Sequence, residues 1–239
     1  NELSFLILDV IEEMRLLQPS SMVQISRKNP DVFVKRALKI TKTGFGQPSF
    51  FNTDAIIKEL LAQGKSIEDA RNGGASGCVE TGAFGTEAYT LSGYFNLNKV
   101  LELTLNNGFD ARTQTQIGLK TGEVSTFVSF EAFYEAFEQQ LNHFINIKLT
   151  GNNAIEKCFA DAMPAPFLSL LINDCIANAK DYNAGGARYN TSYVQGVGLG
   201  SITDSLSSIK KWVFDEKKIN FNSLLGVLQT NFEGTLDWQ

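Results

Sequence analysis

"NGGASGCVETGAFGTEAYTLSGYFN", residues 72–96, decides how this chain is interpreted, because it combines many glycines with a lone cysteine. Cys78 stands two residues before Glu80. Side chains two residues apart in an extended segment point to the same side, so we expect the thiol and the carboxylate to face one space. Glycines at positions 73, 74, 77, 82 and 85 indicate backbone that turns sharply or is closely approached by other groups. The pattern predicts a chemical site, and the plainer alternative is a small buried apolar cysteine.

Two familiar cysteine chemistries fit this stretch poorly. A nucleophilic cysteine works as a thiolate and needs a histidine, a cation or a helix N-terminus to lower its pKa. Here the neighbour is an acid, which raises the pKa of a thiol, and the single histidine is the distant His143. A metal site is disfavoured because Cys78, Cys158 and Cys175 are separated by 80 and 17 residues. The glycines also lack the spacing of phosphate-binding loops.

Hydrogen-atom transfer is the third chemistry, and it requires a protonated thiol. Such a cysteine works as S–H and as a thiyl radical, and a neighbouring carboxylate discourages its ionisation. The carboxylate of Glu80 can meanwhile move protons on the substrate. The residues therefore favour a radical thiol assisted by a carboxylate, and a conventional thiolate enzyme remains an alternative.

The composition is that of a globular protein with no nucleic-acid or membrane partner. The 239 residues are 43% hydrophobic and carry a net charge of −5, which gives no electrostatic reason to bind nucleic acid. No apolar run reaches the roughly 18 to 20 residues of a membrane span. Three cysteines, an odd number, fit a reducing compartment, so we expect a cytoplasmic protein. Its abrupt first and last residues lead us to expect part of a longer protein.

Helix signals occupy most of the chain. Asn29 and Pro30 are expected to be the N-cap and first residue of a helix that ends at Gly44, and Ser66 begins a short helix before Gly73. Further helices are expected over residues 52–64, 96–108, 129–149, 164–181, 203–215 and 222–232. The longest has one broad apolar face, made of Phe130, Phe133, Phe137, Leu141, Phe144 and Ile145.

Strand candidates are short and lie at residues 21–26, around Cys78, and at 188–196. Helices that alternate with short strands are typical of an α/β layered or barrel fold. "GGARYN", residues 185–190, predicts a tight turn into a barrel strand, with Arg188 holding a structural carboxylate or carbonyl. No repeat or linker interrupts the chain, so we expect one domain or part of one.

"GASGCVETG", residues 74–82, resembles the active-site loop of the glycyl radical enzymes, the pyruvate formate-lyase-like family, in the branch with a Gly-Cys-Val-Glu motif. Residues 44–72, 185–190 and 201–218 resemble the segments that precede and follow that loop in the family. The resemblance covers nearly the whole chain. It implies that residues 1–239 are the central part of the family's ten-stranded α/β barrel domain, with the Cys78 loop projecting into the barrel and the glycyl radical domain absent.

The run "GCVETGAFGTEAYTLSGYFNL", residues 77–97, is most similar to the branch that removes water from trans-4-hydroxy-L-proline to give pyrroline-5-carboxylate. The resemblance implies that a thiyl radical at Cys78 takes a hydrogen atom from the substrate carbon beside nitrogen, and that Glu80 transfers a proton. It further implies that Tyr94 lines the substrate pocket. Phe84 is a second candidate for lining that pocket, against simple core packing as the alternative.

The resemblance also implies a radical and partners outside this chain. The family's glycyl radical is installed by a radical SAM activating enzyme, and its members are commonly homodimers of anaerobic metabolism. The chain lacks the Arg-Val-x-Gly pattern of the radical loop, so we expect it to be inactive alone and to bind no cofactor or metal. We expect His143, Cys158 and Cys175 to be structural.

Two alternatives for function stay open. The first is another glycyl radical lyase, such as a glycerol or propanediol dehydratase, a choline or isethionate lyase, or an arylacetate decarboxylase. The diol dehydratases and choline lyase carry a polar pocket residue shortly before the position of Tyr94, where this chain has Leu91 and Ser92. The second alternative is a non-catalytic fragment derived from the family.

Overall fold

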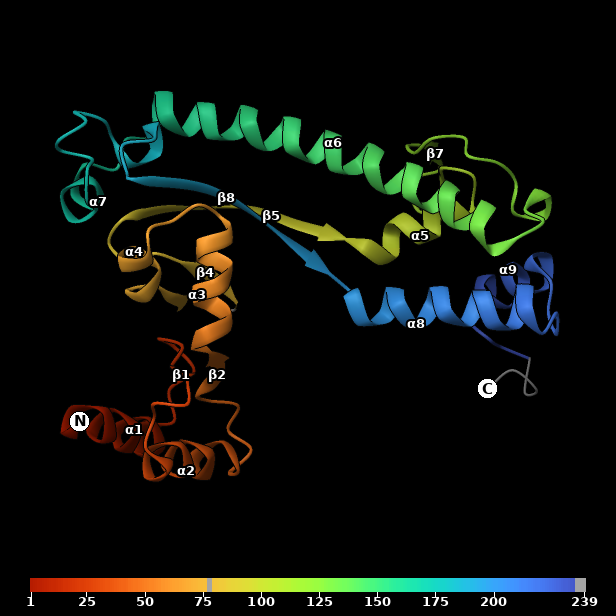
Figure 1. The fold of residues 1–239 in the computed structure, drawn as a ribbon. Coiled ribbons are helices and arrows are strands. Elements are labelled where there is room, and N and C mark those ends of the chain that lie inside the picture. The colour runs from red at the N-terminus through yellow and green to blue at the C-terminus, as the bar shows by residue number, and fades with distance from the viewer. Residues whose placement is uncertain (77–78, 235–239) are drawn as a thin grey trace. The chain divides into compact units, whose positions relative to one another are not determined.

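The computed structural model describes residues 1–76 and 79–234, which form two compact units (Figure 1). Of these residues, the first unit comprises those within 1–90 and 159–193, and the second comprises 91–158 and 194–234. Two strands and one helix run from one unit into the other: β5 (Glu87–Asn96), β8 (Tyr189–Val197) and α6 (Phe130–Ala162). None of the described helices combines the length and the apolar character needed to cross a bilayer.

The first unit begins with helices and short strands in alternation, as the sequence predicts. Its elements are α1 (Glu2–Met14), β1 (Met22–Ile25), α2 (Asp31–Thr41), β2 (Ser49–Asn52), α3 (Thr53–Ala62), α4 (Ile67–Arg71), β3 (Gly74–Ser76), β4 (Glu80–Gly82), α7 (Pro166–Leu171) and a 3-10 turn at Tyr182–Ala184. Strands β1 and β2 pair in parallel, with Met22 opposite Ser49 and Ile25 opposite Asn52. Helices α1 and α2 pack on this pair through Leu8, Val23, Ala37 and Ile40.

The predicted helix starts at Asn52 and Ser66 are confirmed. The side chain of Asn52 accepts a hydrogen bond from the N–H of Ala55, and Ser66 accepts one from Asp69, so each satisfies an N–H that the first turn leaves without a partner. Between these helices and β3 lies a buried cluster of Ile56, Leu60, Ala70 and Ala75. This cluster fixes α3 and α4 against the strand that leads to Cys78.

The second unit is mostly helical and packs around aromatic side chains. Its elements are α5 (Leu97–Leu105), β6 (Phe109–Asp110), β7 (Thr115–Gln116), a 3-10 turn at Val124–Thr126, α8 (Leu199–Ile209), a π-helical segment at Lys210–Asp215 and α9 (Phe221–Gln229). The predicted apolar face of α6 is confirmed, since Phe133 is 0% exposed and Phe137 is 4% exposed. Phe133 contacts the rings of Phe127, Phe130, Phe214 and Phe221.

Four sequence expectations differ from the structure. Asn29 does not cap α2: its side chain accepts from the N–H of Ser26 at 2.6 Å, and the extended Pro30 is the N-cap. The helix expected over 164–181 is only Pro166–Leu171, because Ile172 is extended and Asp174 takes a left-handed φ of 75°. Helix α6 continues to Ala162, through Gly151, well past the expected end at residue 149. Strands β2 and β5 were not expected.

Candidate active site

Glu80 lies on an antiparallel hairpin that the glycine-rich stretch builds. Strand β3 pairs with β4 so that Gly74 faces Gly82 and Ser76 faces Glu80, and residues 77–79 connect the two strands. Glu80 is half-buried, and its Oε2 accepts a hydrogen bond from the N–H of Val79 at 3.2 Å. Cys78 lies outside the described residues, so its expected place beside Glu80 stays a prediction. Val79 belongs to the turn and not to a strand.

Glycines in the hairpin are required by close packing, as the sequence indicates. A Cβ atom at Gly82 would overlap the hydroxyl of Tyr89, and one at Gly74 would come within 2.8 Å of the ring of Phe84. Gly85 takes a φ of +72°, a conformation that L side chains rarely adopt. Aromatic side chains therefore lie directly against the hairpin backbone at Gly74 and Gly82.

The two candidate pocket residues are placed on different units. Phe84 follows β4 in the first unit, and its side chain is partly exposed with its ring against Gly74. Tyr94 lies on β5 in the second unit, three residues before α5 begins, and 66% of it is exposed. Neither ring is buried in a core, so both are accessible to a ligand, and their roles as pocket residues remain predictions.

A buried ion pair lies beside the hairpin, and sequence reasoning missed it. Lys65 Nζ lies 3.0 Å from Glu87 Oε1, and their side chains are 2% and 0% exposed. Glu87 Oε2 accepts a hydrogen bond from the N–H of Ala83 at 2.8 Å. The hydroxyl of Tyr193 donates to the carbonyl oxygen of Thr81 and lies 3.4 Å from Glu87 Oε1. We call Lys65, Glu87 and Tyr193 the buried polar cluster. The spacing of these three residues in the sequence does not predict that they lie close together in the structure.

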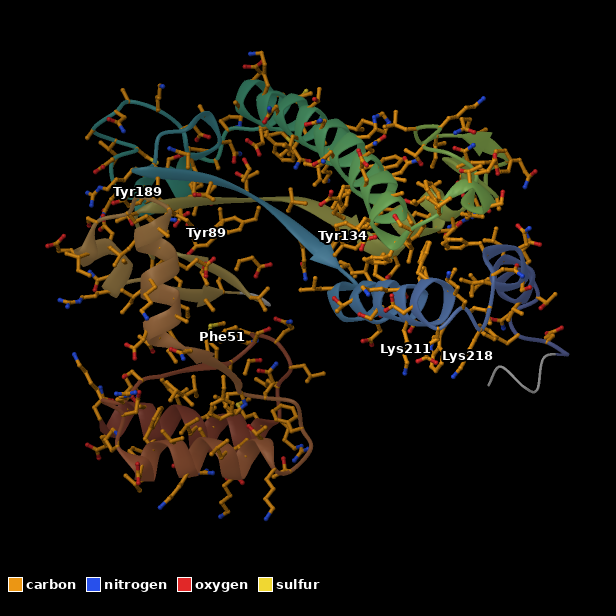
Figure 2. The ribbon with its side chains drawn as sticks, turned by 45° about the vertical axis from the view of Figure 1, so that its right-hand side comes forward. Phe51, Tyr89, Tyr134, Tyr189, Lys211 and Lys218 are labelled. Atoms are coloured by element: carbon orange, nitrogen blue, oxygen red, sulfur yellow. The ribbon has the colours of Figure 1, made fainter. Side chains whose placement is uncertain are left out.

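Burial keeps the tyrosines of this region protonated. Tyr89 and Tyr193 stack with ring centroids 5.8 Å apart and planes 16° from parallel, and Figure 2 shows Tyr89 on its strand. Burial raises the pKa of both phenols, and the negative charge of Glu87 raises each pKa further. Tyr193 is therefore a hydrogen-bond donor across the working pH range of a protein.

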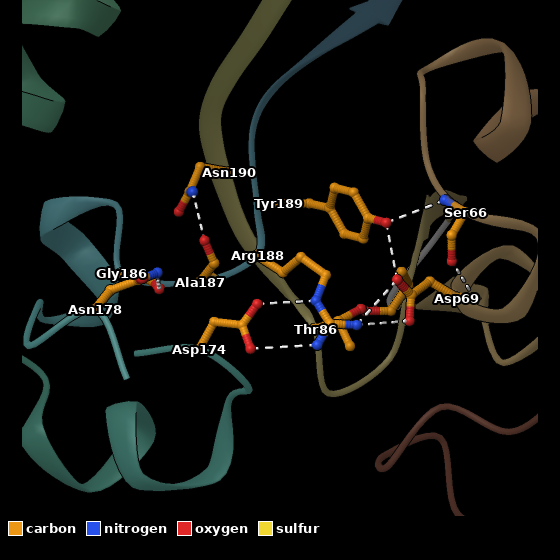
Figure 3. A network of polar contacts seen from close by, with 11 residues as sticks. Ser66, Asp69, Thr86, Asp174, Asn178, Gly186, Ala187, Arg188, Tyr189 and Asn190 are labelled. Carbon is orange, nitrogen blue, oxygen red and sulfur yellow. Dashed lines mark hydrogen bonds and ion pairs between the residues drawn. The ribbon is translucent and has the colours of Figure 1, made fainter. Parts of the chain in front are cut away.

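Arg188 joins the turn before β8 to two acidic residues, as its sequence context predicts (Figure 3). Its Nε lies 2.9 Å from Asp174 Oδ2, and its Nη1 lies 3.2 Å from both carboxylate oxygens of Asp69. Tyr189 donates to Asp69 Oδ2 at 2.8 Å and accepts from the N–H of Ser66. The hydrogen bond from Tyr189, followed by that from Arg188, lowers the pKa of Asp69, and Arg188 lowers the pKa of Asp174. The network is structural, since it ties α4 to β8.

The remaining cysteines and the histidine show no catalytic arrangement. Cys175 is 2% exposed, and its burial, followed by the charges of Asp181 and Asp174, raises the pKa of its thiol. It lies in a turn beside Ala88 and Ala187, not in the helix expected there. Cys158 is exposed on α6, and His143 packs edge-on against Phe144. Within residues 1–76 and 79–234, no three His, Cys, Asp or Glu side chains are grouped to hold a metal ion.

Proteins of assigned function are similar in sequence to this chain across almost its whole length. A profile of the pyruvate formate lyase-like family matches residues 1–237. The trans-4-hydroxy-L-proline dehydratase of Clostridioides difficile is 57% identical over 234 residues, which cover 98% of this chain and 30% of that protein. The (2S)-3-sulfopropanediol dehydratase of Klebsiella oxytoca is 30% identical over 235 residues, covering 98% of this chain and 28% of that protein.

Solved structures show the same fold. The hydroxyproline dehydratase of Clostridioides difficile, with trans-4-hydroxy-L-proline bound, matches with a TM-score of 0.95 at 57% identity over 98% of this chain and 30% of that one. The glycerol-bound, B12-independent glycerol dehydratase of Clostridium butyricum matches with a TM-score of 0.92 at 38% identity over 99% of this chain and 30% of that one.

The chain thus spans about 30% of the length of the relatives it matches, and its helix-rich α/β structure is part of their α/β barrel. The expected fold class is confirmed, apart from the place of the Cys78 loop, which lies outside the described residues. A family profile over residues 1–237 and a relative at 57% identity agree with the motif around Glu80. The chain therefore belongs to the pyruvate formate lyase-like family of glycyl radical enzymes.

Proposed function

We propose that this chain is part of a radical dehydratase that converts trans-4-hydroxy-L-proline to pyrroline-5-carboxylate and water. The observation that carries the proposal is the contrast in identity: 57% to the hydroxyproline dehydratase, against 30% to the sulfopropanediol dehydratase and 38% to the glycerol dehydratase. All three comparisons cover at least 98% of this chain, so the contrast is not caused by different lengths of alignment.

In this proposal Cys78 and Glu80 divide the chemistry between a hydrogen atom and a proton. The sulfur of Cys78, as a thiyl radical, takes a hydrogen atom from the ring carbon beside nitrogen and becomes S–H. The C–O bond on the neighbouring carbon then breaks, and the hydroxyl leaves as water while Glu80 assists the accompanying proton transfer. The sulfur of Cys78 finally returns its hydrogen atom to the product radical. Atoms balance, because only water is lost.

The hairpin geometry supports these roles for the residues that the structure describes. Glu80 begins β4 directly after the connection that contains Cys78, and it is half-buried, so its carboxylate is neither free in solvent nor locked in the core. Phe84 and Tyr94, both exposed, are the side chains we assign to the substrate pocket. The ring of hydroxyproline is small and partly apolar, and aromatic side chains suit such a ligand.

We further propose the partners that this chemistry requires. A glycyl radical, carried on a segment that this chain does not contain and installed by a radical SAM activating enzyme, supplies the hydrogen-atom acceptor for Cys78. The complete protein is proposed to be a cytoplasmic homodimer of anaerobic metabolism. Without the radical segment, this chain alone is proposed to be inactive.

The test uses the intact protein that contains this chain, activated without oxygen. Incubation with trans-4-hydroxy-L-proline is expected to yield pyrroline-5-carboxylate, measured by mass spectrometry. Cys78→Ser is expected to abolish turnover while the glycyl radical signal in electron paramagnetic resonance is kept. Glu80→Gln is expected to lower kcat at least a hundredfold, within the range of general acid–base catalysis, about 10² to 10⁴.

A substrate panel separates this proposal from its rivals within the family. Glycerol, propane-1,2-diol, choline, isethionate and an arylacetate are supplied to the same activated protein. Turnover of one of these, with no pyrroline-5-carboxylate from hydroxyproline, would replace the proposed substrate. Full activity of Cys78→Ser would refute the radical role of the thiol.

A further inference from the structure

Side chains bind the backbone of strand β4 and of the residue that follows it. Strand β4 pairs with β3 alone in a two-stranded sheet, and among the described residues no strand lies on its other edge. The hydroxyl of Tyr193 donates to the carbonyl of Thr81, the residue that follows Glu80. Two residues further, the N–H of Ala83 donates to Glu87 Oε2 at 2.8 Å. The backbone that carries Glu80 is therefore anchored at Thr81 and again at Ala83, just after the end of β4.

Each anchor is itself fixed by burial and charge. Glu87 has a side chain that is 0% exposed, and its Oε1 is held 3.0 Å from the ammonium of Lys65. A buried carboxylate has few arrangements that satisfy all its lone pairs, so such a cluster specifies one geometry. The three members come from separate parts of the first unit: the turn after α3, strand β5 and strand β8.

Tyr193 is a permanent donor in this arrangement. Its pKa is raised by burial and then by Glu87, so the phenol keeps the proton that it gives to the carbonyl of Thr81. Its ring is held independently, by stacking on Tyr89 at 5.8 Å. Removing the hydroxyl alone would thus release the edge of β4 without removing the ring that supports it.

We propose that Tyr193 and Glu87 are positioning residues that set the place of the Glu80 carboxylate for proton transfer. This inference rests on the proposed function, in which Glu80 assists the loss of water. A general acid or base must lie within hydrogen-bond reach of its proton, and a misplacement of about 1 Å can cost about a hundredfold in rate. The anchors at Thr81 and Ala83 act on the backbone within three residues of Glu80.

The experiment compares two variants of one stacked pair in the intact, activated protein. Tyr193→Phe removes the hydroxyl that binds Thr81. Tyr89→Phe is the matched control, because within the part of the chain that the structure describes the hydroxyl of Tyr89 has no hydrogen-bond partner. Both variants lose one buried oxygen and keep the stacked rings.

Tyr193→Phe is expected to lower kcat for hydroxyproline about tenfold, with KM changed less than twofold, since a lost anchor shifts the strand by less than 1 Å. The solvent deuterium isotope effect on kcat is expected to rise, because proton transfer becomes the slower step. The glycyl radical content is expected to match that of the wild type, and the thermal midpoint is expected to fall only by the effect of one lost hydrogen bond, so that the protein stays folded at the assay temperature. Tyr89→Phe is expected to keep the wild-type kcat.

Three outcomes would overturn the inference: wild-type kcat in Tyr193→Phe, an equal loss of kcat in both variants, or a loss of kcat accounted for by lost radical content or by unfolding at the assay temperature. The last would make the anchor merely structural. The proposed function is tested separately, by the substrate on which the wild type acts. A wild type that acts on a different substrate of the panel refutes the proposed substrate, and the ratio of variant to wild type with that substrate then tests the positioning role.

Discussion

Two buried clusters, one in each compact unit, are built from very different side chains. Beside the hairpin, the first unit encloses an ammonium, a carboxylate and two phenols, with Lys65 and Glu87 almost wholly buried. The second unit encloses phenylalanines, with Phe133 at 0% exposure among four other rings. An apolar core tolerates changes that conserve volume, whereas a buried polar cluster requires each partner in one position. The buried polar cluster beside Glu80 therefore fixes its partners more strictly than the phenylalanine cluster does.

Breaking the buried ion pair should have the largest effect. Glu87→Leu leaves the ammonium of Lys65 buried without its partner, and we expect a loss of about 3–5 kcal/mol in the free energy of unfolding. Unfolding in urea, followed by circular dichroism, measures this loss.

The double variant Lys65→Met with Glu87→Leu sharpens the same test. It removes both charges, so we expect it to recover much of the stability, but not all, because the N–H of Ala83 still lacks its acceptor. A double variant as unstable as Glu87→Leu would show that the unpaired charge is not the cause.

A change of similar chemical extent in the second unit should cost less. Phe133→Leu keeps an apolar side chain among neighbouring rings, and we expect a loss of about 1.5 kcal/mol in the free energy of unfolding. The same urea experiment gives the value. A loss as large as that of Glu87→Leu would contradict the expectation that the phenylalanine cluster tolerates substitution better than the buried polar cluster.

The smallest effect concerns acid stability in the first unit. The hydrogen bond from Tyr189, followed by that from Arg188, lowers the pKa of Asp69, and Arg188 lowers the pKa of Asp174. Both carboxylates therefore contribute stability above the unfolded pKa of about 3.9. This contribution is lost as the pH falls through the folded pKa values. When the pH is lowered from 6 to 3, the free energy of unfolding should therefore fall less in Arg188→Gln than in the wild type. Urea unfolding at each pH measures this difference.

Lys210→Gln provides the control for that measurement. Lys210 pairs with Asp215 at 2.8 Å, but both side chains are about half exposed, and such surface pairs contribute little. Its acid profile should follow the wild type. A profile shifted as much as that of Arg188→Gln would show a general effect of removing positive charge.

Local signals in the sequence were sufficient for much of the fold. Asn52, Ser66 and Asn96 each cap the helix that their spacing predicts, because a cap depends only on residues three positions ahead. The region at 164–181 could not be predicted in this way. There Ile172 is extended, and Asp174 has a left-handed backbone and binds Arg188, which lies 14 residues later; no local signal reveals such a distant contact.

The same contrast between local signals and distant contacts applies to the candidate site. The motif around Cys78 and Glu80 is contiguous, and the sequence alone identifies it. The buried polar cluster cannot be predicted from the sequence, because Tyr193 is 106 residues from Glu87 and neither residue belongs to a local motif. Only folding brings the donor of one strand to the carbonyl of another.

The packing of Tyr89 on Gly82 has a consequence for how related genes can diverge. The hydroxyl occupies the space where any side chain at residue 82 would begin. A related protein with alanine at position 82 needs a smaller side chain, or a displaced ring, at position 89. These two codons are therefore expected to vary together across descendants of this gene.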